Sequence, residues 1–253
     1  MSASVRYTLI IPCYNEAEGV PHLREALQPV IARLMADGEV ELLFVDDGST
    51  DGTGDLLRAA FADWPFVRIL PHPRNLGLGA ALRTGFQAAR GEIVITTDSD
   101  GTYPFEEILA MLRFMSEDVD LVTASPYHPG GGIEGVPLWR QLFSFGASFL
   151  YRLILRSPVR TYTALFRAYR RRVLEGISIE ADGYVAVAEI MAKAIRQGFR
   201  VAEYPTTLRV RRFGRSKMKI LRTVMNHLRL MARLIRPGRL SRSSPFRPLA
   251  RKG

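Results

Sequence analysis

The chain has 253 residues, of which 47% are hydrophobic, so disorder over most of its length is excluded. Its single cysteine, Cys13, excludes an internal disulfide framework and fits a reducing compartment, and no run of about 20 apolar residues predicts a transmembrane helix. The net charge is +10, and the excess is concentrated after Arg196, where Glu203 is the only acid. Such a basic end predicts a polyanionic partner: nucleic acid, an anionic membrane or a phosphorylated substrate.

The N-terminal part of the chain predicts strands that alternate with helices. Apolar, β-branched runs typical of buried strands occupy residues 5–12, 41–45, 66–70 and 92–97, and helices are expected at 15–36, 53–64 and 77–90. The first helix is expected to use Asn15 as its N-cap and to pass through Pro29. A strand that begins at Val5 predicts that no signal peptide precedes it. This alternation predicts an α/β fold with a mostly parallel central sheet flanked by helices.

The pattern changes after Asp100. Helices are expected at residues 105–115, 138–156, 170–175, 185–197 and 217–235, and strands at 120–124, 166–169 and 200–211. Pro205 lies inside the last of these strands and predicts an edge position, because proline has no backbone N–H to donate to a neighbour. Gly130-Gly131-Gly132 predicts a flexible loop, and the tail from Pro237, rich in Arg, Ser and Pro, is expected to be disordered.

Three of the predicted strands end in polar clusters, at residues 12–16, 46–49 and 98–100. Because parallel strands carry their carboxyl ends to the same edge, where open α/β sheets bind ligands, these clusters are expected to converge. Asp98 and Asp100 repel each other unless a cation lies nearby, and a hard divalent ion with oxygen ligands is the natural candidate. For Asp46-Asp47 alone, capping of the next helix is as good an explanation as ligand binding.

Several other site classes are disfavoured by the sequence. No Gly-x-Gly-x-x-Gly follows the first predicted strand and no Gly-Lys-Ser/Thr loop is present, which argues against dinucleotide oxidoreductases and phosphate-loop nucleotidases. A nucleotide would instead be held by its phosphates through a metal. The four histidines lack zinc-ligand spacing, and Cys13 has no evident histidine partner that would make it a nucleophile.

Taken together, the motifs of this chain resemble those of glycosyltransferase family 2. The resemblance rests on Pro12-x-Tyr14-Asn15-Glu16, Val45-Asp46-Asp47-Gly48-Ser49-x-Asp51-Gly52, Asn75-x-Gly77 and Asp98-x-Asp100. A narrower similarity, to the dolichol- and polyprenyl-phosphate mannosyltransferases, rests on Tyr127-x-x-Gly130-Gly131, Trp139-Arg140-x-x-x-Ser144, Phe166-Arg167-Ala168-Tyr169, Glu203-x-Pro205 and Arg211-x-x-Gly214-x-Ser216-Lys217. The matching motifs are spread over residues 5–235.

The resemblance implies a glycosyltransferase-A (Rossmann-like) fold in one catalytic domain, residues 1–236, followed by the basic tail at 237–253. Within that domain, residues 1–104 would bind the nucleotide sugar and residues 105–216 the acceptor. Residues 217–236 would form a basic amphipathic helix at the membrane interface.

The resemblance also implies roles for individual residues. The donor's nucleoside would be bound by Pro12, Tyr14, Glu16, Val45 and Asp47. The donor diphosphate would lie along Asp98, Ser99 and Asp100, of which the two aspartates would ligate Mg²⁺ or Mn²⁺. Arg211 and Lys217 would close on the diphosphate or the acceptor phosphate, and Arg140 and Ser144 would bind the phosphate of the lipid acceptor.

The implied reaction is a metal-dependent, inverting transfer of a sugar from a nucleotide sugar to polyprenyl or dolichyl phosphate. The narrower similarity favours mannose from GDP-mannose, at the cytoplasmic face of the membrane. A UDP-sugar donor, a hydroxyl acceptor, or a degenerate relative that binds a lipid or partner without catalysis are the alternatives. With a hydroxyl acceptor, Glu189 is the candidate base; its alternative role is an ion pair with Lys193 at i+4.

The sequence departs from the mannosyltransferase pattern at four positions. Thr102 replaces a glutamine that often helps to ligate the metal, and Pro126 replaces an arginine that binds phosphate. Thr161 and Leu165 stand where an acid and a glycine are usual. Because of these four changes, the donor need not be GDP-mannose and the acceptor need not be a polyprenyl phosphate. The same changes are the reason for considering a degenerate relative without catalytic activity.

Both long helices predicted in the second half are amphipathic. Apolar side chains line one face of each, namely Leu142, Phe145, Phe149, Leu153 and Ile154 in the first and Ile220, Leu221, Val224, Met225, Leu228, Met231 and Ile235 in the second. The pattern fits either a core-packed helix with a solvated basic face or an interfacial helix on an anionic leaflet. Nucleic-acid binding is not favoured, because no RNA-stacking motif accompanies the basic residues.

Overall fold

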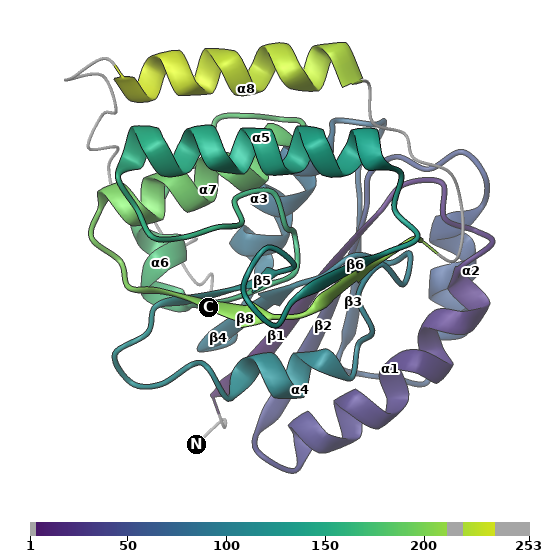
Figure 1. The fold of residues 1–253 in the computed structure, drawn as a ribbon. Coiled ribbons are helices and arrows are strands. Elements are labelled where there is room, and N and C mark those ends of the chain that lie inside the picture. The colour runs from purple at the N-terminus through teal and green to yellow at the C-terminus, as the bar shows by residue number, and fades with distance from the viewer. Residues whose placement is uncertain (1–3, 212–219, 236–253) are drawn as a thin grey trace.

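The computed structural model describes residues 4–211 and 220–235, and its centre is a seven-stranded sheet (Figure 1). The strands of this sheet are β1 (Val5–Cys13), β2 (Glu39–Asp46), β3 (Val67–Pro71), β4 (Ile93–Thr96), β5 (Leu121–Ser125), β7 (Arg167–Arg170) and β8 (Val201–Pro205). They lie in the order β3-β2-β1-β4-β7-β5-β8, and neighbouring strands are parallel except where β7 is involved. The mostly parallel sheet predicted from the sequence is confirmed.

Helices cover both faces of this sheet. One face carries α1 (Val20–Met35), α2 (Thr53–Ala60) and α4 (Glu107–Leu112), and the other carries α3 (Leu78–Ala88), α6 (Arg171–Gly176) and α7 (Val185–Arg196) (Figure 1). Because β1 is covered on both sides, its centre is a continuous apolar run rather than an alternating one, and Leu9, Ile10 and Ile11 have no exposed surface.

Two long helices form an outer layer on the α7 side of the molecule. These are α5 (Leu138–Leu155) and α8 (Ile220–Ile235), which pack against α7 and against each other (Figure 1). Within the described residues, no helix combines the length and the apolar character that crossing a bilayer requires. The predicted start of the last helix at Lys217 and the predicted disordered tail from Pro237 lie outside the described residues.

The first helix begins later than predicted, and the prediction that Asn15 is its N-cap is wrong. α1 starts at Val20, with proline in its first turn, where a missing N–H leaves no bond unmade. Asn15 instead adopts a left-handed conformation, with φ of 52°, and its side-chain oxygen accepts a hydrogen bond of 2.8 Å from the backbone N–H of Thr50. The residue therefore connects the loops that follow β1 and β2.

A second, two-stranded sheet corrects two predictions. Its parallel strands are β6 (Gly132–Glu134) and β9 (Thr207–Arg209), so the predicted flexible glycine loop ends in a strand. The predicted strand 200–211 is divided at Thr206 into β8 and β9. β8 lies at the edge of the large sheet, as Pro205 indicated. β9 lies beside the loop that follows β4, since the backbone N–H of Arg209 donates to the carbonyl of Thr102 at 3.2 Å.

Candidate active site

The carboxyl ends of β1, β2 and β4 meet at one edge of the sheet, because these three strands are adjacent and parallel. Hydrogen bonds join the loops that follow β1 and β2. The backbone N–H of Asn15 donates to the Ser49 hydroxyl at 2.9 Å, and that of Glu16 donates to the Thr53 hydroxyl at the same distance. The three polar clusters seen in the sequence therefore converge as predicted.

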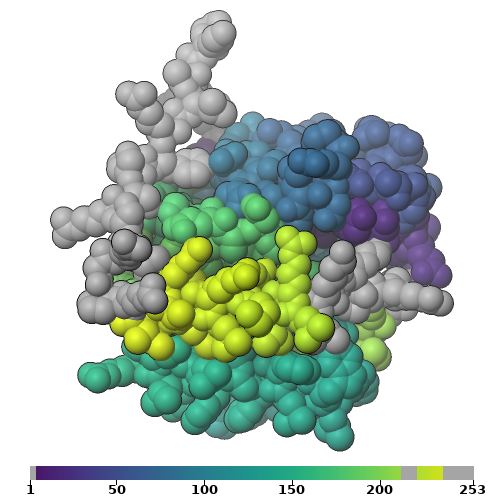
Figure 2. Space-filling model, turned by 90° about the horizontal axis from the view of Figure 1, so that it is seen from above, coloured from purple at the N-terminus to yellow at the C-terminus, as the bar shows by residue number. Residues whose placement is uncertain are grey.

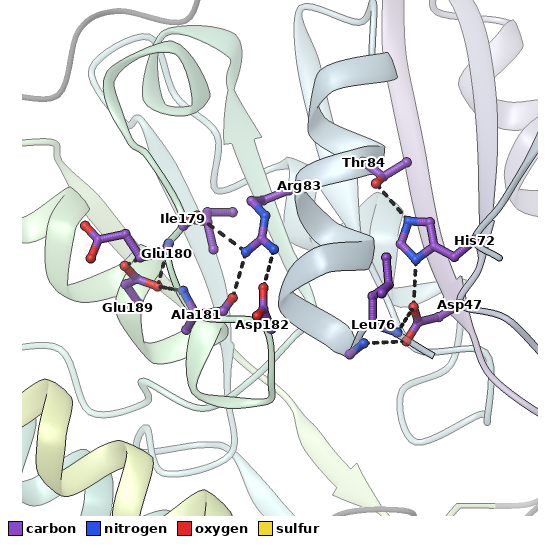
Figure 3. A network of polar contacts seen from close by, with 11 residues as sticks. Asp47, His72, Leu76, Arg83, Thr84, Ile179, Glu180, Ala181, Asp182 and Glu189 are labelled. Carbon is purple, nitrogen blue, oxygen red and sulfur yellow. Dashed lines mark hydrogen bonds and ion pairs between the residues drawn. The ribbon is translucent and has the colours of Figure 1, made fainter. Parts of the chain in front are cut away.

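Asp47, at the end of β2, is the centre of a dense hydrogen-bond network (Figure 3). Its carboxylate lies 2.7 to 3.0 Å from four nitrogen atoms: Nδ1 of His72, Nδ2 of Asn75 and the backbone nitrogens of Leu76 and Gly77. Both carboxylate oxygens are used, and Asp47 is almost fully buried. In this structure the residue fixes the loop between β3 and α3, and its contact with a nucleoside stays a prediction.

The other predicted nucleoside residues lie at the same edge with different exposure. Pro12, Tyr14 and Glu16 are half-buried where the chain leaves β1. Val45 has no exposed surface and packs in the core between the sheet and α3. The Val45 side chain therefore supports the sheet, and the contact of this residue with a nucleoside, which would use its backbone, stays a prediction.

Asp98 and Asp100 follow β4 and lie where negative charge is poorly solvated. Burial, followed by the repulsion of Asp100, raises the pKa of Asp98 to about 8, and the nearby Arg211 offsets part of this rise. Asp100 is paired with Arg211, whose Nη2 lies 3.1 Å from its Oδ2. The structure thus brings the predicted cation Arg211 to the predicted metal aspartates.

The chemistry of this pair of acids fits a divalent cation. Two crowded carboxylates, of which Asp98 has its pKa raised by burial and by the charge of the other, gain stability when a cation is bound between them. Among residues 4–211 and 220–235, no group of three or more His, Cys, Asp or Glu side chains is arranged to hold a metal. The described protein residues therefore offer a two-carboxylate site rather than a complete cage.

A cavity of about 440 Å³ extends from these acids to the outer helices. At one end its lining includes Asp98, Asp100 and Arg211. At the other end it is lined by α5 and α8, and the lining there includes Arg140, Ser144, Phe143, Leu150, Val224, Leu228 and Met231. Ser144 shares a 2.6 Å hydrogen bond with the hydroxyl of Thr163, and the Arg140 guanidinium lies 6.0 Å from the ring centre of Trp139. The two predicted metal aspartates, Arg211 and the predicted acceptor residues thus line one cavity, whereas Ser99, between the aspartates, is buried and is not part of its lining.

Residues 8–178 match the family described as Glycosyl transferase family 2. The chain belongs to this family. It is therefore a glycosyltransferase, and the family resemblance seen in its motifs is confirmed.

Named relatives make the similarity narrower. The chain is 37% identical over 221 residues to the polyprenol monophosphomannose synthase of Mycolicibacterium smegmatis, covering 84% of this chain and 81% of that protein. It is 34% identical over 220 residues to the undecaprenyl-phosphate mannosyltransferase of Micrococcus luteus, covering 85% and 88%. It is 29% identical over 234 residues to the dolichol-phosphate mannosyltransferase of Pyrococcus furiosus, covering 92% and 64%.

Solved structures confirm the glycosyltransferase-A fold. Glucosyl-3-phosphoglycerate synthase from Mycobacterium tuberculosis, in complex with Mn²⁺, UDP and phosphoglyceric acid, superposes with a TM-score of 0.68 at 21% identity, covering 93% of this chain and 80% of that one. The complex of the same synthase with Mg²⁺ and UDP gives a TM-score of 0.67 at 20% identity, covering 90% and 79%.

Glu189 does not lie at the active site of this glycosyltransferase, and we correct its assignment as a candidate base. It is buried on α7, where its Oε1 lies 2.7 Å from Nζ of Lys193. Its carboxylate also accepts hydrogen bonds of 3.1 and 2.9 Å from the backbone N–H groups of Glu180 and Ala181 (Figure 3). The ion pair anticipated as the alternative is present, and it anchors the loop that precedes α7.

Three of the four departures from the mannosyltransferase pattern lie in the cavity wall formed by the segments that follow β5 and precede β7. Pro126, Thr161 and Leu165 all line it. The Thr161 hydroxyl lies 2.7 Å from that of Ser125, which donates to Glu203 at 2.7 Å. The Glu203 carboxylate also accepts hydrogen bonds from the backbone N–H groups of Arg160 and Thr161, at 2.9 and 3.1 Å, so it fixes this part of the wall without a cation at position 126.

The structure adds residues that sequence reasoning did not single out. Tyr103 and Tyr184 line the cavity near the acids, and burial raises the pKa of both phenols. His227 lines it from α8 and lies 2.9 Å from the hydroxyl of Tyr151 on α5. The sequence could have indicated His227, because this polar residue lies on the apolar face of its helix, together with Val224 and Met231. Lys217, the second predicted closing cation, lies outside the described residues.

Proposed function

We propose that this glycosyltransferase transfers mannose from GDP-mannose to a polyprenyl or dolichyl phosphate at a membrane surface. The observation that carries the proposal is the composition of this cavity: Asp98, Asp100 and Arg211 lie at one end, and Arg140 lies among apolar side chains at the other. A nucleoside diphosphate with a metal matches the first end, and a prenyl chain with a phosphate head matches the second. The names of all three relatives pair mannose with a prenyl lipid.

Asp98 and Asp100 would hold Mg²⁺ or Mn²⁺ in this proposal. A bound divalent ion would neutralise the negative charge that develops on the leaving diphosphate. Since the described residues supply two carboxylates, the remaining ligands would be diphosphate oxygens and water. Crystals of the related synthase with Mn²⁺ or Mg²⁺ and UDP are consistent with this arrangement.

The acceptor would need positioning more than activation. A phosphate monoester has a second pKa of about 6 and is largely dianionic at pH 7, so its oxygen can attack the anomeric carbon without a general base. As that bond forms, the bond from the anomeric carbon to the diphosphate oxygen breaks, with inversion at the carbon. Arg211 would stabilise the departing diphosphate, and Arg140 with Ser144 would hold the attacking phosphate.

In this proposal, the donor and the acceptor are bound by different parts of the chain. Residues 1–104 would bind the donor, with Pro12, Tyr14, Glu16 and Asp47 around its nucleoside and Ser99 beside the diphosphate. Residues 105–216 would form the acceptor side, and the helix within 217–236 would lie at the membrane interface. Lys217 would add a second cation to the closed site.

The outer layer supports docking on an anionic leaflet. α8 packs through Leu230, Met231 and Leu234, which are buried, while other apolar side chains of α5 and α8 are exposed: Leu138, Leu142, Phe145, Phe149, Leu153, Leu221, Met225, Leu228 and Ile235. Figure 2 shows α8 running across one face of the molecule beside α5. Exposed arginines on the same helices, Arg152, Arg222, Arg229 and Arg233, would add electrostatic attraction. We propose a peripheral position on the cytoplasmic face of the membrane.

A direct test compares donors on one acceptor. Purified protein with Mn²⁺ would be given polyprenyl phosphate in detergent and GDP-mannose, GDP-glucose, UDP-glucose or UDP-galactose, and the glycolipid would be quantified by mass. We expect mannolipid from GDP-mannose. Transfer from UDP-sugars alone would overturn the donor assignment, and transfer only to hydroxyl acceptors would overturn the acceptor assignment.

A further inference from the structure

The two oxygens of the Asp100 carboxylate are engaged in different ways. Oδ1 accepts two hydrogen bonds from Thr102, one from the backbone N–H at 2.9 Å and one from the hydroxyl at 2.5 Å. Oδ2 lies 3.1 Å from Nη2 of Arg211. Both donors to Oδ1 belong to Thr102, two residues after Asp100, so donors and acceptor are parts of the same short loop. Oδ2 is held by a long side chain from a distant segment, and that contact can be exchanged without moving the loop.

The pair between Arg211 and Asp100 is better shielded from solvent than most ion pairs among the described residues. The Asp100 side chain is 8% exposed and that of Arg211 is 21% exposed. Arg209, two residues earlier, pairs with Glu134 at 3.5 Å, and both of those side chains are more than 40% exposed. Since solvent screens the first pair less, Arg211 competes effectively with any other cation for Oδ2.

We propose that Arg211 is the resting counter-ion of Asp100 and that the divalent ion, arriving with the donor diphosphate, displaces it from Oδ2. The exchange conserves charge pairing, because the metal replaces the guanidinium on Asp100 while the guanidinium becomes free to pair with the diphosphate. Thr102 is a positioning residue in this scheme: it holds Oδ1, so that Oδ2 is the oxygen presented to either cation. The inference rests on the proposed function only in placing a metal at Asp100.

Metal binding without turnover tests the exchange. The free Mn²⁺ signal in electron paramagnetic resonance would be titrated with the full-length protein, with and without GDP. Arg211→Gln is expected to tighten Mn²⁺ binding in the absence of GDP by tenfold or more, because its competitor is removed. The same variant should bind GDP in the presence of Mn²⁺ more weakly, because the diphosphate loses its arginine.

The opposite signs of these two effects distinguish exchange from damage to the site. A merely structural role for Arg211 would weaken both ligands. Arg209→Gln is the matched control: it removes one positive charge from the same segment but leaves Asp100 paired, so its Mn²⁺ affinity should stay within twofold of the wild-type value. Arg211→Lys, which keeps the charge and loses the planar fork, is expected to lie between wild type and Arg211→Gln.

Thr102 has its own pair of variants. Thr102→Ser retains the hydroxyl and should preserve Mn²⁺ affinity. Thr102→Val retains the shape and the backbone N–H bond but removes the hydroxyl bond to Oδ1, so it should weaken Mn²⁺ binding by about tenfold or more, the size of one hydrogen bond to a charged group. Equal affinities in the two variants would overturn the positioning role. Circular dichroism of each variant would verify that it is folded.

The result separates this inference from the proposed function. Mn²⁺ that binds the wild-type protein with GDP, but is not bound more tightly by Arg211→Gln, overturns the exchange and leaves the metal site intact. Mn²⁺ that binds neither protein, with or without GDP, overturns the proposed metal site itself.

Discussion

The aspartates that follow β2 and β4 lie at the same sheet edge and are used in opposite ways. Asp47 is surrounded by four nitrogen donors of the next loop, which occupy both of its oxygens. Asp100 has two donors on one oxygen and an arginine on the other, and its neighbour Asp98 is left with a raised pKa. An acid at the end of a strand can thus bind a ligand when neutral hydrogen-bond donors leave one of its carboxylate oxygens without a partner among them. Where the donors are complete, the acid instead builds the loop.

The sharpest test of this difference is Asp100→Asn. The amide keeps the shape and the Oδ1 contact with Thr102 but loses the charge, so we expect transfer to fall by a thousandfold or more, about 4 kcal/mol of transition-state stabilisation. The midpoint of urea unfolding should hardly change. Initial rates of glycolipid formation and unfolding curves would be measured on the same preparation. Full activity of the wild-type protein in EDTA would contradict the metal role of this residue.

Asp47→Asn should show the reverse pattern. Its amide NH₂ would face N–H donors of the loop, leaving buried groups unpaired, so we expect a loss of about 2–4 kcal/mol of unfolding free energy. The control is Asp46→Asn, whose carboxylate accepts a single local bond of 3.0 Å from the backbone N–H of Ser49. Urea denaturation would check both variants. If Asp47→Asn proved as stable as wild type but failed to bind GDP, the role of Asp47 would be the proposed nucleoside contact and not the structure of the loop.

Arg140→Ala tests the other end of the cavity. We expect the acceptor KM to rise or kcat to fall by tenfold or more, about 1.4 kcal/mol, while GDP affinity is unchanged. Arg152→Ala is the matched control, because it removes an exposed arginine of the same helix that does not line the cavity. Both variants would be assayed with acceptor dispersed in detergent, so that membrane attraction does not contribute. An equal loss in the two variants would argue against a specific phosphate contact.

The smallest effects are expected at the outer layer. Affinity for vesicles that contain anionic lipid should fall as salt rises, and Arg229→Ala should weaken it about fivefold, corresponding to ~1 kcal/mol for one cation near the surface. Sedimentation with vesicles of phosphatidylglycerol and phosphatidylcholine would measure this. Equal binding to neutral vesicles would remove the electrostatic contribution, and binding to neither would favour a helix that serves only to pack.

How far the sequence predicts this molecule depends on how local each feature is. The convergence of the three polar clusters was predictable, because alternating strands and helices impose a parallel sheet whatever the details. The left-handed conformation of Asn15 could not be predicted, since its hydrogen-bond partner Thr50 belongs to the loop after another strand. The saturation of Asp47 likewise depends on a loop that begins 25 residues later, at His72. The pairing of Glu189 with Lys193 could be anticipated because it lies within one helical turn.

The position of β7 shows the same limit at the level of topology. This strand lies between β4 and β5 and runs antiparallel to both, although β5 precedes it in the chain. A hydrophobic run indicates that a strand exists, but its place in the sheet is decided by packing among elements far apart in sequence. The cavity wall near Pro126, Thr161 and Leu165 depends on that order, because β7 and the segment before it bring residues 161–165 beside the end of β5.

The burial of His227 between α8 and α5 makes the docking of the outer helix sensitive to acid. Burial lowers the pKa of His227 to about 4, whereas an unfolded or undocked histidine titrates near its ordinary value of 6.5. The detached form therefore binds more protons between these values, and the docking of α8 loses stability as pH falls from about 6.5 toward 4. Above that window the imidazole is neutral in both forms and contributes no pH dependence. At neutral pH the contact between α8 and α5 is thus insensitive to small changes in acidity, while an acidic medium would weaken the docking of the helix on the rest of the enzyme.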